Sequence, residues 1–352
     1  MQYSTFGRRT GLRVSQLALG TGNFGTGWGY GSERDEAKSV FDAYVAAGGN
    51  FIDTADNYQV GQSEQLVGEF IAADRDHFVL ASKYTLGSAP SAGLSRTGNS
   101  RKNMIQSVEA SLKRLKTDRI DLYWAHFSDG ATPVDEILRA FDDLVRSGKI
   151  LYAGLSNFPA WRIARADMMA ELRGWSPLIG IQTEYSLVER SAERELLPMA
   201  EALGLGAALW SPLGGGLLTG KYRASKEGRL TGFAGVLVHT EKNARDTAIV
   251  DALLAVAAEL DVAASHVAIA WLLAKAGSSS TALVPILGSR TREQLDATLG
   301  AVKLALTAAQ LAQLDAASAF ELGTPHDAIV RSVAGITGGQ AAQLRAPFVP
   351  AA

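Results

Sequence analysis

Four polar residues of the types used in acid–base catalysis follow three consecutive apolar runs of the chain. Asp53 and Tyr58 stand in the stretch Asp-Thr-Ala-Asp-Asn-Tyr after the first run. Lys83 follows the second run, and His126 follows the third, in Asp-Leu-Tyr-Trp-Ala-His. Taken singly, such a Lys is commonly solvated and such a His is commonly packed in a core. At the same end of three neighbouring strands, about 4.8 Å apart, the side chains can converge, which favours a shared site.

The residue types predict proton transfer by a tyrosine. Tyr58 has a reference pKa of about 10, and lowering it by about 3 to reach neutral pH corresponds to about 4 kcal/mol. One ammonium about 4 Å away supplies about 4 kcal/mol at an effective dielectric constant near 20, so Lys83 alone is of the right size. Asp53 would keep Lys83 charged and oriented. His126 would hydrogen-bond the substrate oxygen or relay a proton.

This arrangement is suited to a carbonyl group that receives hydride. A carbonyl oxygen held by Tyr58 and His126 becomes an alkoxide when hydride arrives, and the two donors stabilise that charge. None of the four groups can supply hydride, and the sequence contains no Cys and no evident cluster of metal ligands. The chemistry therefore requires a bound nicotinamide, and no metal is expected.

The elements that must position these residues alternate between short apolar runs and amphipathic helical stretches. The expected strands are Gln16–Gly20, Phe51–Asp53, Phe78–Ser82, Asp121–Trp124, Leu151–Leu155, Gly180–Gln182, Gly206–Trp210 and Leu283–Ile286. The expected helices are 33–47, 63–73, 101–116, 133–147, 160–172, 192–203, 244–260, 265–276 and 291–300. Most strands read apolar on both faces, as in a buried parallel sheet. The pattern predicts an α/β fold, a (β/α)8 TIM barrel, in preference to an open doubly wound sheet.

A hairpin, three long connections and a C-terminal tail are expected in addition to the barrel strands and helices. Tyr3–Phe6 and Leu12–Val14 flank a Gly-containing turn and predict an N-terminal β-hairpin. Three long connections follow expected strands and so lie at the C-terminal face, where a barrel carries its active site: Asn23–Ser32, Tyr84–Ser100 and Ser211–Asn243. We expect residues 1–330 to form one barrel domain. Residues 331–352, rich in Ala with little periodicity, would form a tail that is either mobile or a cover of the mouth.

Composition excludes several classes of protein. The 352 residues include 34 Lys and Arg and 36 Asp and Glu, and this near-neutral balance argues against a nucleic-acid partner. The absence of Cys excludes disulfides, thiolate nucleophiles and zinc–thiolate sites. Neither a signal peptide nor a run of 18 apolar residues is present, so we expect a soluble, cytoplasmic protein without a membrane partner. Whether it forms a homo-oligomer is left open.

Two glycine motifs point to other folds but each fails at one place. Gly20-Thr-Gly-Asn-Phe-Gly25 matches GxGxxG after a strand, yet the Gly-rich stretch that follows is a poor helix former, against a Rossmann unit. Gly215-Gly-Leu-Leu-Thr-Gly-Lys-Tyr222 is nearly a P-loop, but Tyr222 replaces the Ser or Thr that binds magnesium. The backbone of this second loop can still cradle a phosphate.

The sequence resembles the aldo-keto reductase superfamily over about residues 2–318. The segment from Asp53 to Tyr58 resembles the first family signature, and Lys83 and His126 complete an Asp-Tyr-Lys-His tetrad. The resemblance implies an oxidoreductase that transfers hydride between NADPH and an aldehyde or ketone, or oxidises an alcohol in reverse, with Tyr58 as the general acid and base. Its partner would be a small-molecule carbonyl or alcohol.

The resemblance also implies a cofactor site. Gly154-Leu-Ser-Asn-Phe158 resembles the turn that binds the nicotinamide carboxamide, and Ser211–Gly214 with Gly216–Lys221 resembles the loop over the pyrophosphate. Trp210 stands where the family has an aromatic stacked on the nicotinamide. The implied contacts at this end are Gly22, Asn23, Asp53, Ser156, Asn157, Gln182, Trp210, Ser211, Pro212, Leu213, Gly214, Leu217, Gly220 and Lys221.

The segment Pro285–Gln294 resembles the site for the adenosine phosphate. Arg290 would contact the 2′-phosphate of NADPH, since a guanidinium suits planar phosphate recognition. Gly288, Ser289 and Gln294 match neighbouring contact positions. Thr298 stands where many members have an Asn that meets adenine, so NADH stays open as an alternative cofactor.

The sequence also offers candidate substrate contacts and leaves two other functions open. Trp28, Tyr30 and Trp124 are candidate substrate contacts, because small-ligand pockets are mostly apolar, although each could instead serve packing. A Schiff-base lyase would use the strand-end Lys83 as its amine. A non-catalytic NADPH-binding regulatory module can share the same fold. The cofactor motifs argue against the lyase, and the complete tetrad argues against the regulatory module.

Overall fold

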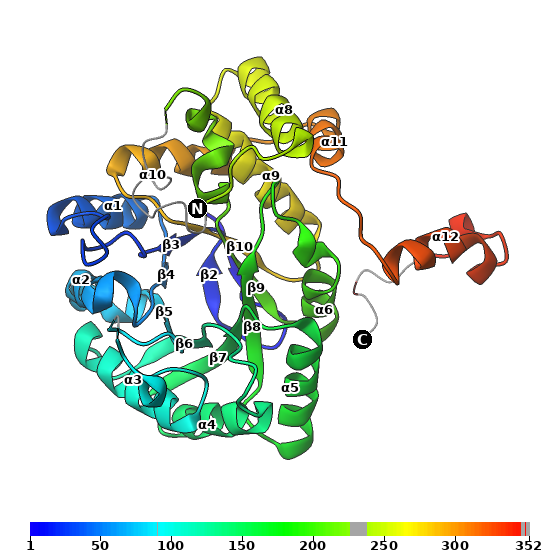
Figure 1. Ribbon diagram of the computed structural model, residues 1–352. Coiled ribbons are helices and arrows are strands. Elements are labelled where there is room, and N and C mark those ends of the chain that lie inside the picture. Colours follow the sequence, from blue (N-terminus) through cyan, green and yellow to red (C-terminus); the bar gives the residue numbers. More distant parts are fainter. Residues whose placement is uncertain (90, 226–237, 346–348, 350–352) are drawn as a thin grey trace.

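Eight parallel strands close into a barrel in the order β10-β3-β4-β5-β6-β7-β8-β9, and helices surround it (Figure 1). The computed structural model describes residues 1–89, 91–225, 238–345 and 349. The predicted (β/α)8 barrel is therefore confirmed. Its strands are β3 (Ala18–Gly20), β4 (Phe51–Asp53), β5 (Val79–Tyr84), β6 (Ile120–Ala125), β7 (Ile150–Ser156), β8 (Leu178–Glu184), β9 (Gly206–Trp210) and β10 (Leu283–Leu287).

The helices form where the sequence offers apolar stripes and caps. They are α1 (Arg34–Ala46), α2 (Gln62–Phe70), α3 (Arg101–Leu115), α4 (Val134–Arg146), α5 (Ala160–Arg173), α6 (Leu196–Leu203), α8 (Ala244–Leu260), α9 (Ala264–Ser278), α10 (Arg292–Leu299), α11 (Ala308–Ala317) and α12 (His326–Ile336). Side-chain caps fix several starts: Ser100 accepts from the Asn103 amide before α3, and Thr307 forms a capping box with Gln310 before α11.

The predicted helices are found, with shifted ends. The helix predicted over 63–73 ends at Phe70, and a short 3-10 helix, Ala72–His77, follows it. The helix predicted over 192–203 is split into a 3-10 turn and α6, whose first turn accommodates Pro198, because the prolyl nitrogen needs no hydrogen bond there. Helices α11 and α12 were not predicted: the expected helices end at position 300, and the Ala-rich sequence of α11 carries little periodicity.

The N-terminal hairpin closes the bottom of the barrel. Strands β1 (Tyr3–Thr5) and β2 (Arg13–Ser15) pair antiparallel, as predicted. Phe6 then inserts into the barrel and meets the rings of Phe51 and Trp124 edge-on at 5.6 and 6.2 Å. A β-carbon at Gly180 would lie 2.4 Å from the Phe6 ring. Glycine is therefore needed on the strand that faces this plug.

The long connections emerge at the opposite, C-terminal end. They join β3 to α1, β5 to α3 and β9 to α8, as predicted. Position 90 of the second connection and positions 226–237 of the third lie outside the described residues. In the described part of the chain no single helix is long and apolar enough to cross a membrane. Helices α8 and α9 together have the required length and composition, but the pair is bent by 100°.

The last helix crosses the expected boundary between barrel domain and tail. Helix α12 begins at His326 and ends at Ile336, so position 330 lies inside it. It stands away from the barrel and does not cover the mouth (Figure 1). Positions 346–348 and 350–352 of the predicted tail lie outside the described residues.

Candidate active site

The side chain of Lys83 forms the centre of the site at the C-terminal end of the barrel. Its Nζ donates hydrogen bonds to Asp53 Oδ2 at 2.6 Å, to the Thr54 carbonyl at 2.7 Å and to Tyr58 Oη at 3.1 Å. Lys83 is completely buried on β5, and Asp53 ends the neighbouring strand β4. The predicted convergence of strand-end residues is therefore found between these two strands.

Charge pairing keeps Lys83 protonated in this buried position. Burial alone would lower the pKa of its ammonium, but attraction to Asp53 and Tyr58 outweighs burial and raises the pKa above its ordinary value. Gln182, on β8, donates to the other carboxylate oxygen of Asp53 at 2.8 Å. Asp53 is thus held by two donors from opposite sides, and Lys83 carries a fixed positive charge below Tyr58.

Tyr58 is held in place by the loops around it. Its ring meets Trp28 edge-on at 5.9 Å and His126 at 6.0 Å, and the backbone of Gly22 lies against it. Gln59, the next residue, has a left-handed backbone (φ 51°), and its side-chain amide donates to the Gly22 carbonyl at 2.8 Å. Sequence reasoning missed Gln59, for which no motif gave a signal.

His126 sits beside Tyr58 as a neutral imidazole. Burial, with the nearby Lys83 charge, lowers its pKa well below the ordinary value. Its Nδ1 is buried and has no hydrogen-bond partner among the described residues. A neutral imidazole has one N–H to donate, which suits it to orient an uncharged oxygen rather than to neutralise an anion.

The turn predicted to bind the nicotinamide is tied to this cluster. Asn157 adopts a left-handed backbone (φ 54°) and donates from Nδ2 to the His126 carbonyl at 2.9 Å. Trp210 Nε1 donates to Asn157 Oδ1 at 3.1 Å. Ser156 is fully buried beside them, and its hydroxyl also accepts from Asn157 Nδ2. Ser156, Asn157, Gln182 and Trp210 are therefore brought together at one side of the tetrad.

The loop predicted to bind the pyrophosphate winds through left-handed positions. Ser211, Gly214, Gly215 and Gly216 have φ of 52, 57, 65 and 105°, and Gly220 follows at 74°. Backbone N–H groups in such a run can form a concave anion site. Lys221 comes directly after it in a short 3-10 turn. Leu217 in the same loop is buried.

The adenosine-phosphate residues lie next to the first mouth loop. The side-chain Nδ2 of Asn23 donates to the Gly288 carbonyl at 2.8 Å. This bond connects the loop after β3 to the loop after β10. The guanidinium of Arg290 lies 5.0 Å over the Tyr30 ring. Arg290 Nε and Asn23 Oδ1 are both buried without a hydrogen-bond partner among the described residues. Unpaired buried polar atoms of this kind fit a site that completes its hydrogen bonds with a ligand.

Two other predicted contacts at this end are already engaged. Gln294 Oε1 accepts from the backbone N–H of Arg290 at 2.9 Å, just before Thr291, the N-cap of α10. Thr298 is buried, and its hydroxyl donates to the Leu295 carbonyl of its own helix at 2.8 Å. The Thr298 hydroxyl therefore does not point to a ligand in this structure. Ser289 is also buried.

The three aromatic residues predicted to meet substrate are not brought together. Trp28 is partly exposed and lies at Tyr58, as expected for a pocket wall. Tyr30 instead stacks on Arg290. Trp124 is completely buried in the barrel interior, where its ring packs over Gly154 and against Phe6. Trp124 lies one inward position before His126 on β6, beside Lys83 in the strand register, and its ring fills the barrel interior.

A buried polar cluster behind the tetrad was not predicted. Glu64 accepts from Ser82 at 2.5 Å and from Arg114 Nε at 2.6 Å. Asp56 is buried nearby, and its Oδ1 has no partner among the residues the structure describes. Burial, reinforced by the charge of Glu64, raises the pKa of Asp56 to about 7, against the opposing effect of Arg114. The cluster joins residues far apart in sequence, for which the pattern gave no signal.

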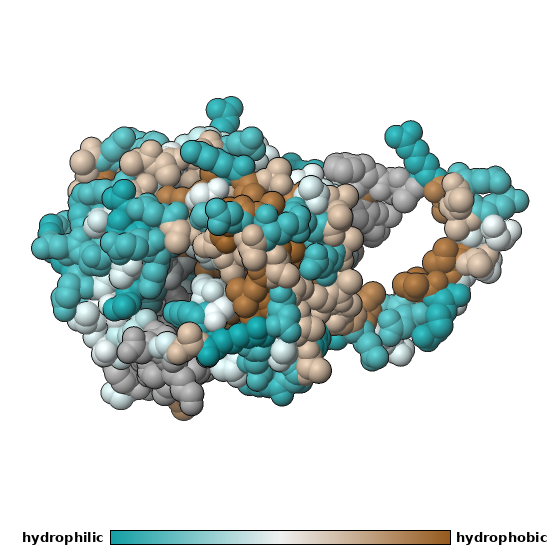
Figure 2. All heavy atoms as spheres, turned by 90° about the horizontal axis from the view of Figure 1, so that it is seen from above, coloured by the Kyte–Doolittle hydropathy of each residue, from teal (hydrophilic) through white to brown (hydrophobic). Residues whose placement is uncertain are grey.

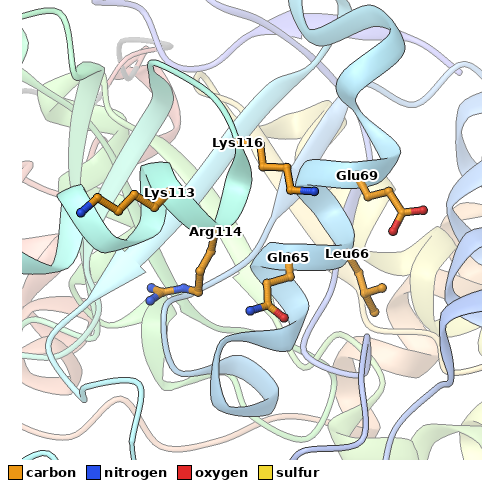
Figure 3. A pocket seen from close by; sticks show the side chains of 6 residues that line it. All are labelled: Gln65, Leu66, Glu69, Lys113, Arg114 and Lys116. Atoms are coloured by element: carbon orange, nitrogen blue, oxygen red, sulfur yellow. The ribbon is translucent and has the colours of Figure 1, made fainter.

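Arg114 also lines a groove on the outside of the barrel. The groove lies between α2 and α3 and is lined by Gln65, Leu66, Glu69, Lys113, Arg114 and Lys116 (Figure 3). None of the four tetrad residues lines it. Among the described residues no group of three or more His, Asp or Glu is arranged to hold a metal ion.

Comparison with known proteins places the chain in a family. The family model described as the aldo/keto reductase family matches residues 16–319. The chain is 37% identical to norsolorinic acid reductase of Aspergillus flavus over 324 residues, which cover 90% of this chain and 80% of that protein. It is 41% identical over 315 residues to the uncharacterized oxidoreductase YrpG of Bacillus subtilis, covering 87% and 92% of the two chains. It is 33% identical over 340 residues to the putative aryl-alcohol dehydrogenase AAD14 of Saccharomyces cerevisiae, covering 92% and 88%. The chain belongs to the aldo/keto reductase family.

Proposed function

We propose that this chain is an NADPH-dependent carbonyl reductase that converts an aldehyde or ketone to an alcohol, with Tyr58 as the general acid. In the reverse direction Tyr58 would act as the base. The observation that carries the proposal is the buried Lys83 ammonium, which bonds to Asp53 and to Tyr58 Oη together. An ammonium so placed serves the phenol oxygen and has no other evident use in the fold.

The size of the effect supports this role. A tyrosinate left after proton transfer would lie 3.1 Å from the Lys83 ammonium, an attraction of about 5 kcal/mol at an effective dielectric constant near 20. Donation near neutral pH requires about 4 kcal/mol. Asp53 and Gln182 hold the ammonium and its counter-ion in position. Neutral His126 would orient the carbonyl oxygen toward Tyr58.

The residues around the tetrad fit a nicotinamide dinucleotide, which when bound supplies the hydride. Asn157 and Gln182, with Ser156, would hold the carboxamide, and Trp210 would cover the ring. The left-handed loop from Ser211 to Lys221 would hold the pyrophosphate, together with the backbone near Gly22. Arg290 and Asn23, each with an unpaired buried polar atom, support binding at the adenosine end. An arginine there favours NADPH over NADH.

An aromatic carbonyl compound is the substrate class we propose. One relative is named a putative aryl-alcohol dehydrogenase, and an aryl alcohol is an alcohol that carries an aromatic ring. In this chain Trp28 lies edge-on to Tyr58 and is partly exposed, so an aromatic ring can pack beside the reacting carbonyl.

The geometry disfavours the two alternatives. A Schiff-base lyase needs an uncharged amine, whereas pairing with Asp53 raises the pKa of Lys83. A purely regulatory nucleotide-binding module has no need for the Lys83–Tyr58 contact. Neither is supported by an observation of its own.

The test is a fluorescence titration of the chain with NADPH and with NADH, followed by NADPH oxidation with a panel of aromatic and aliphatic carbonyl compounds. We expect tighter binding of NADPH and turnover with the aromatic members. Tight binding without turnover on any carbonyl would favour the regulatory module. A borohydride-trapped adduct on Lys83, with no nucleotide binding, would favour the lyase.

A further inference from the structure

Helix α12 forms an arm that is tied to the barrel only at its base. Phe320 packs its ring near the guanidinium of Arg194, which also donates to the Glu321 carbonyl at 2.9 Å. His326, the first residue of α12, lies 3.8 Å from Glu195. Beyond it, the hydrogen bonds of residues 327–345 all stay within the arm in the described part of the chain. Among the described residues, the arm therefore has no hydrogen-bond partner on its own barrel past its base.

The arm carries an unsatisfied apolar face. Ile329, Val333 and Ile336 follow one another at helical spacing and are exposed, with Val330 beside them. In Figure 2 the hydrophobic side of the arm faces the barrel across an open gap, and its hydrophilic side faces outward. An isolated helix of 11 residues is only marginally stable in water, so α12 needs a partner surface to persist.

A second apolar face lies on α5, on the same side of the barrel (Figure 1). Trp161, Met168 and Leu172 stand 7 and 4 residues apart, which places them on one helix face, and they are 65, 64 and 78% exposed. The opposite face of α5 is packed on the barrel. Together α5 and α12 hold seven of the fourteen large hydrophobic side chains that are exposed among the described residues. Two such concentrations on one molecule indicate an interface.

We propose that α12 is an exchanged arm that packs against α5 of a second copy of this chain and so forms a two-fold symmetric dimer. The gap beside the arm lacks an occupant from the described part of its own chain, and α5 is fixed in the barrel. The α5 helix that fills the gap would therefore belong to a second copy of the chain, whose apolar face packs against α12. Two-fold symmetry uses each contact twice, which helps to reach the roughly 1,200–2,000 Å² of a stable interface.

The first test measures the mass of the full chain in solution by light scattering. We expect a dimer for the native sequence and a monomer for Ile336→Asp and for Leu172→Asp, each with unchanged circular dichroism. Leu94→Asp is the matched control, because Leu94 is exposed but lies on neither helix. A monomeric native chain, or a dimer that survives both substitutions, would overturn the proposal.

The second test decides which chain the arm binds, using the absence of natural Cys. Ile336→Cys and Leu172→Cys are made in separate preparations, mixed and mildly oxidised. We expect a disulfide-linked pair containing one copy of each variant, and no such pair with Leu94→Cys in place of Leu172→Cys. Ile336→Cys and Leu172→Cys are also combined in one chain. If this double variant forms its disulfide within one chain and stays monomeric, the arm covers its own barrel and the proposal fails.

Discussion

The two ends of the barrel interior are built by the same strands and yet have opposite character. On β4 the inward column runs from Phe51 to Asp53, and on β5 it runs from Val79 through Ala81 to Lys83. The lower layer is apolar and is sealed by Phe6 of the hairpin. The upper layer is polar and meets Tyr58 and the mouth loops.

This difference shows how the fold separates stability from chemistry. The lower layer buries large rings in close contact, which stabilises the barrel whatever reaction it carries. The upper layer buries a charged pair, and the cost of desolvating such a pair is rarely recovered in stability. We therefore expect substitutions in the upper layer to affect turnover first, and substitutions in the lower layer to affect stability first.

The largest effect is expected for Lys83→Met, which removes the charge at the centre of the upper layer. We expect turnover to fall by about 10³-fold, because about 4–5 kcal/mol of stabilisation of the tyrosinate is lost. The unpaired Asp53 carboxylate should also destabilise the fold by about 3–5 kcal/mol. The double variant Asp53→Asn with Lys83→Met is the control: stability should recover while turnover does not. Turnover within tenfold of the native rate in either variant would contradict the assignment.

At the other end, Phe6→Ala should destabilise the chain by about 3–5 kcal/mol, because it empties the plug between Phe51 and Trp124. Urea unfolding measures the loss, and steady-state kinetics on the folded variant should give turnover within a few-fold of the native value. A large loss of turnover with unchanged stability would show that the two ends are not independent.

Asp56 is a buried carboxyl group at the upper end of the barrel, and its ionisation is expected to destabilise the folded state. Its folded pKa of about 7 exceeds the unfolded value near 4, so the folded state binds more protons between these pH values. Stability should therefore fall as pH rises from 4 to 7, by at most about 4 kcal/mol. The neighbours that set this behaviour are Glu64, Arg114 and Lys83.

Asp56→Asn should remove that component of the pH dependence. The variant should gain stability relative to the native chain at pH 8 and show little gain at pH 4.5, as measured by urea unfolding at both pH values. Asp35→Asn, at an exposed site on α1, is the control. An equal effect of Asp56→Asn at both pH values would mean that the carboxyl does not titrate in this range.

The smallest expected effect concerns the adenosine end of the mouth. Arg290→Leu should weaken NADPH binding by about 10–100-fold, the equivalent of one charge-assisted contact of about 1.5–3 kcal/mol, and should leave NADH binding nearly unchanged. Fluorescence titration measures both. Equal weakening of NADPH and NADH would assign Arg290 to packing against Tyr30 rather than to the 2′-phosphate.

Much of this organisation follows from the sequence. The strand-end positions of Asp53 and Lys83 were predictable, because parallel strands bring their carboxyl ends to one face. For Trp124 the sequence left substrate contact and packing both open, and its ring packs on Gly154 and Phe6. The Glu64–Arg114 contact spans 50 residues, and nothing local in the sequence encodes such a pairing. The apolar spacing of Ile329, Val333 and Ile336 was present in the sequence, but nothing in the sequence indicated that α12 would stand away from the barrel as an arm.

The most direct test of the central claim is Tyr58→Phe, which removes the phenol oxygen and leaves the ring that packs on Trp28 and Gly22. NADPH affinity is measured by fluorescence titration, and turnover is measured with the best carbonyl substrate of the panel. The account predicts affinity within a few-fold of the native value and turnover reduced by at least about 10³-fold, comparable to the energy assigned to the Lys83–Tyr58 contact. Native-like turnover in this variant would contradict proton transfer by Tyr58.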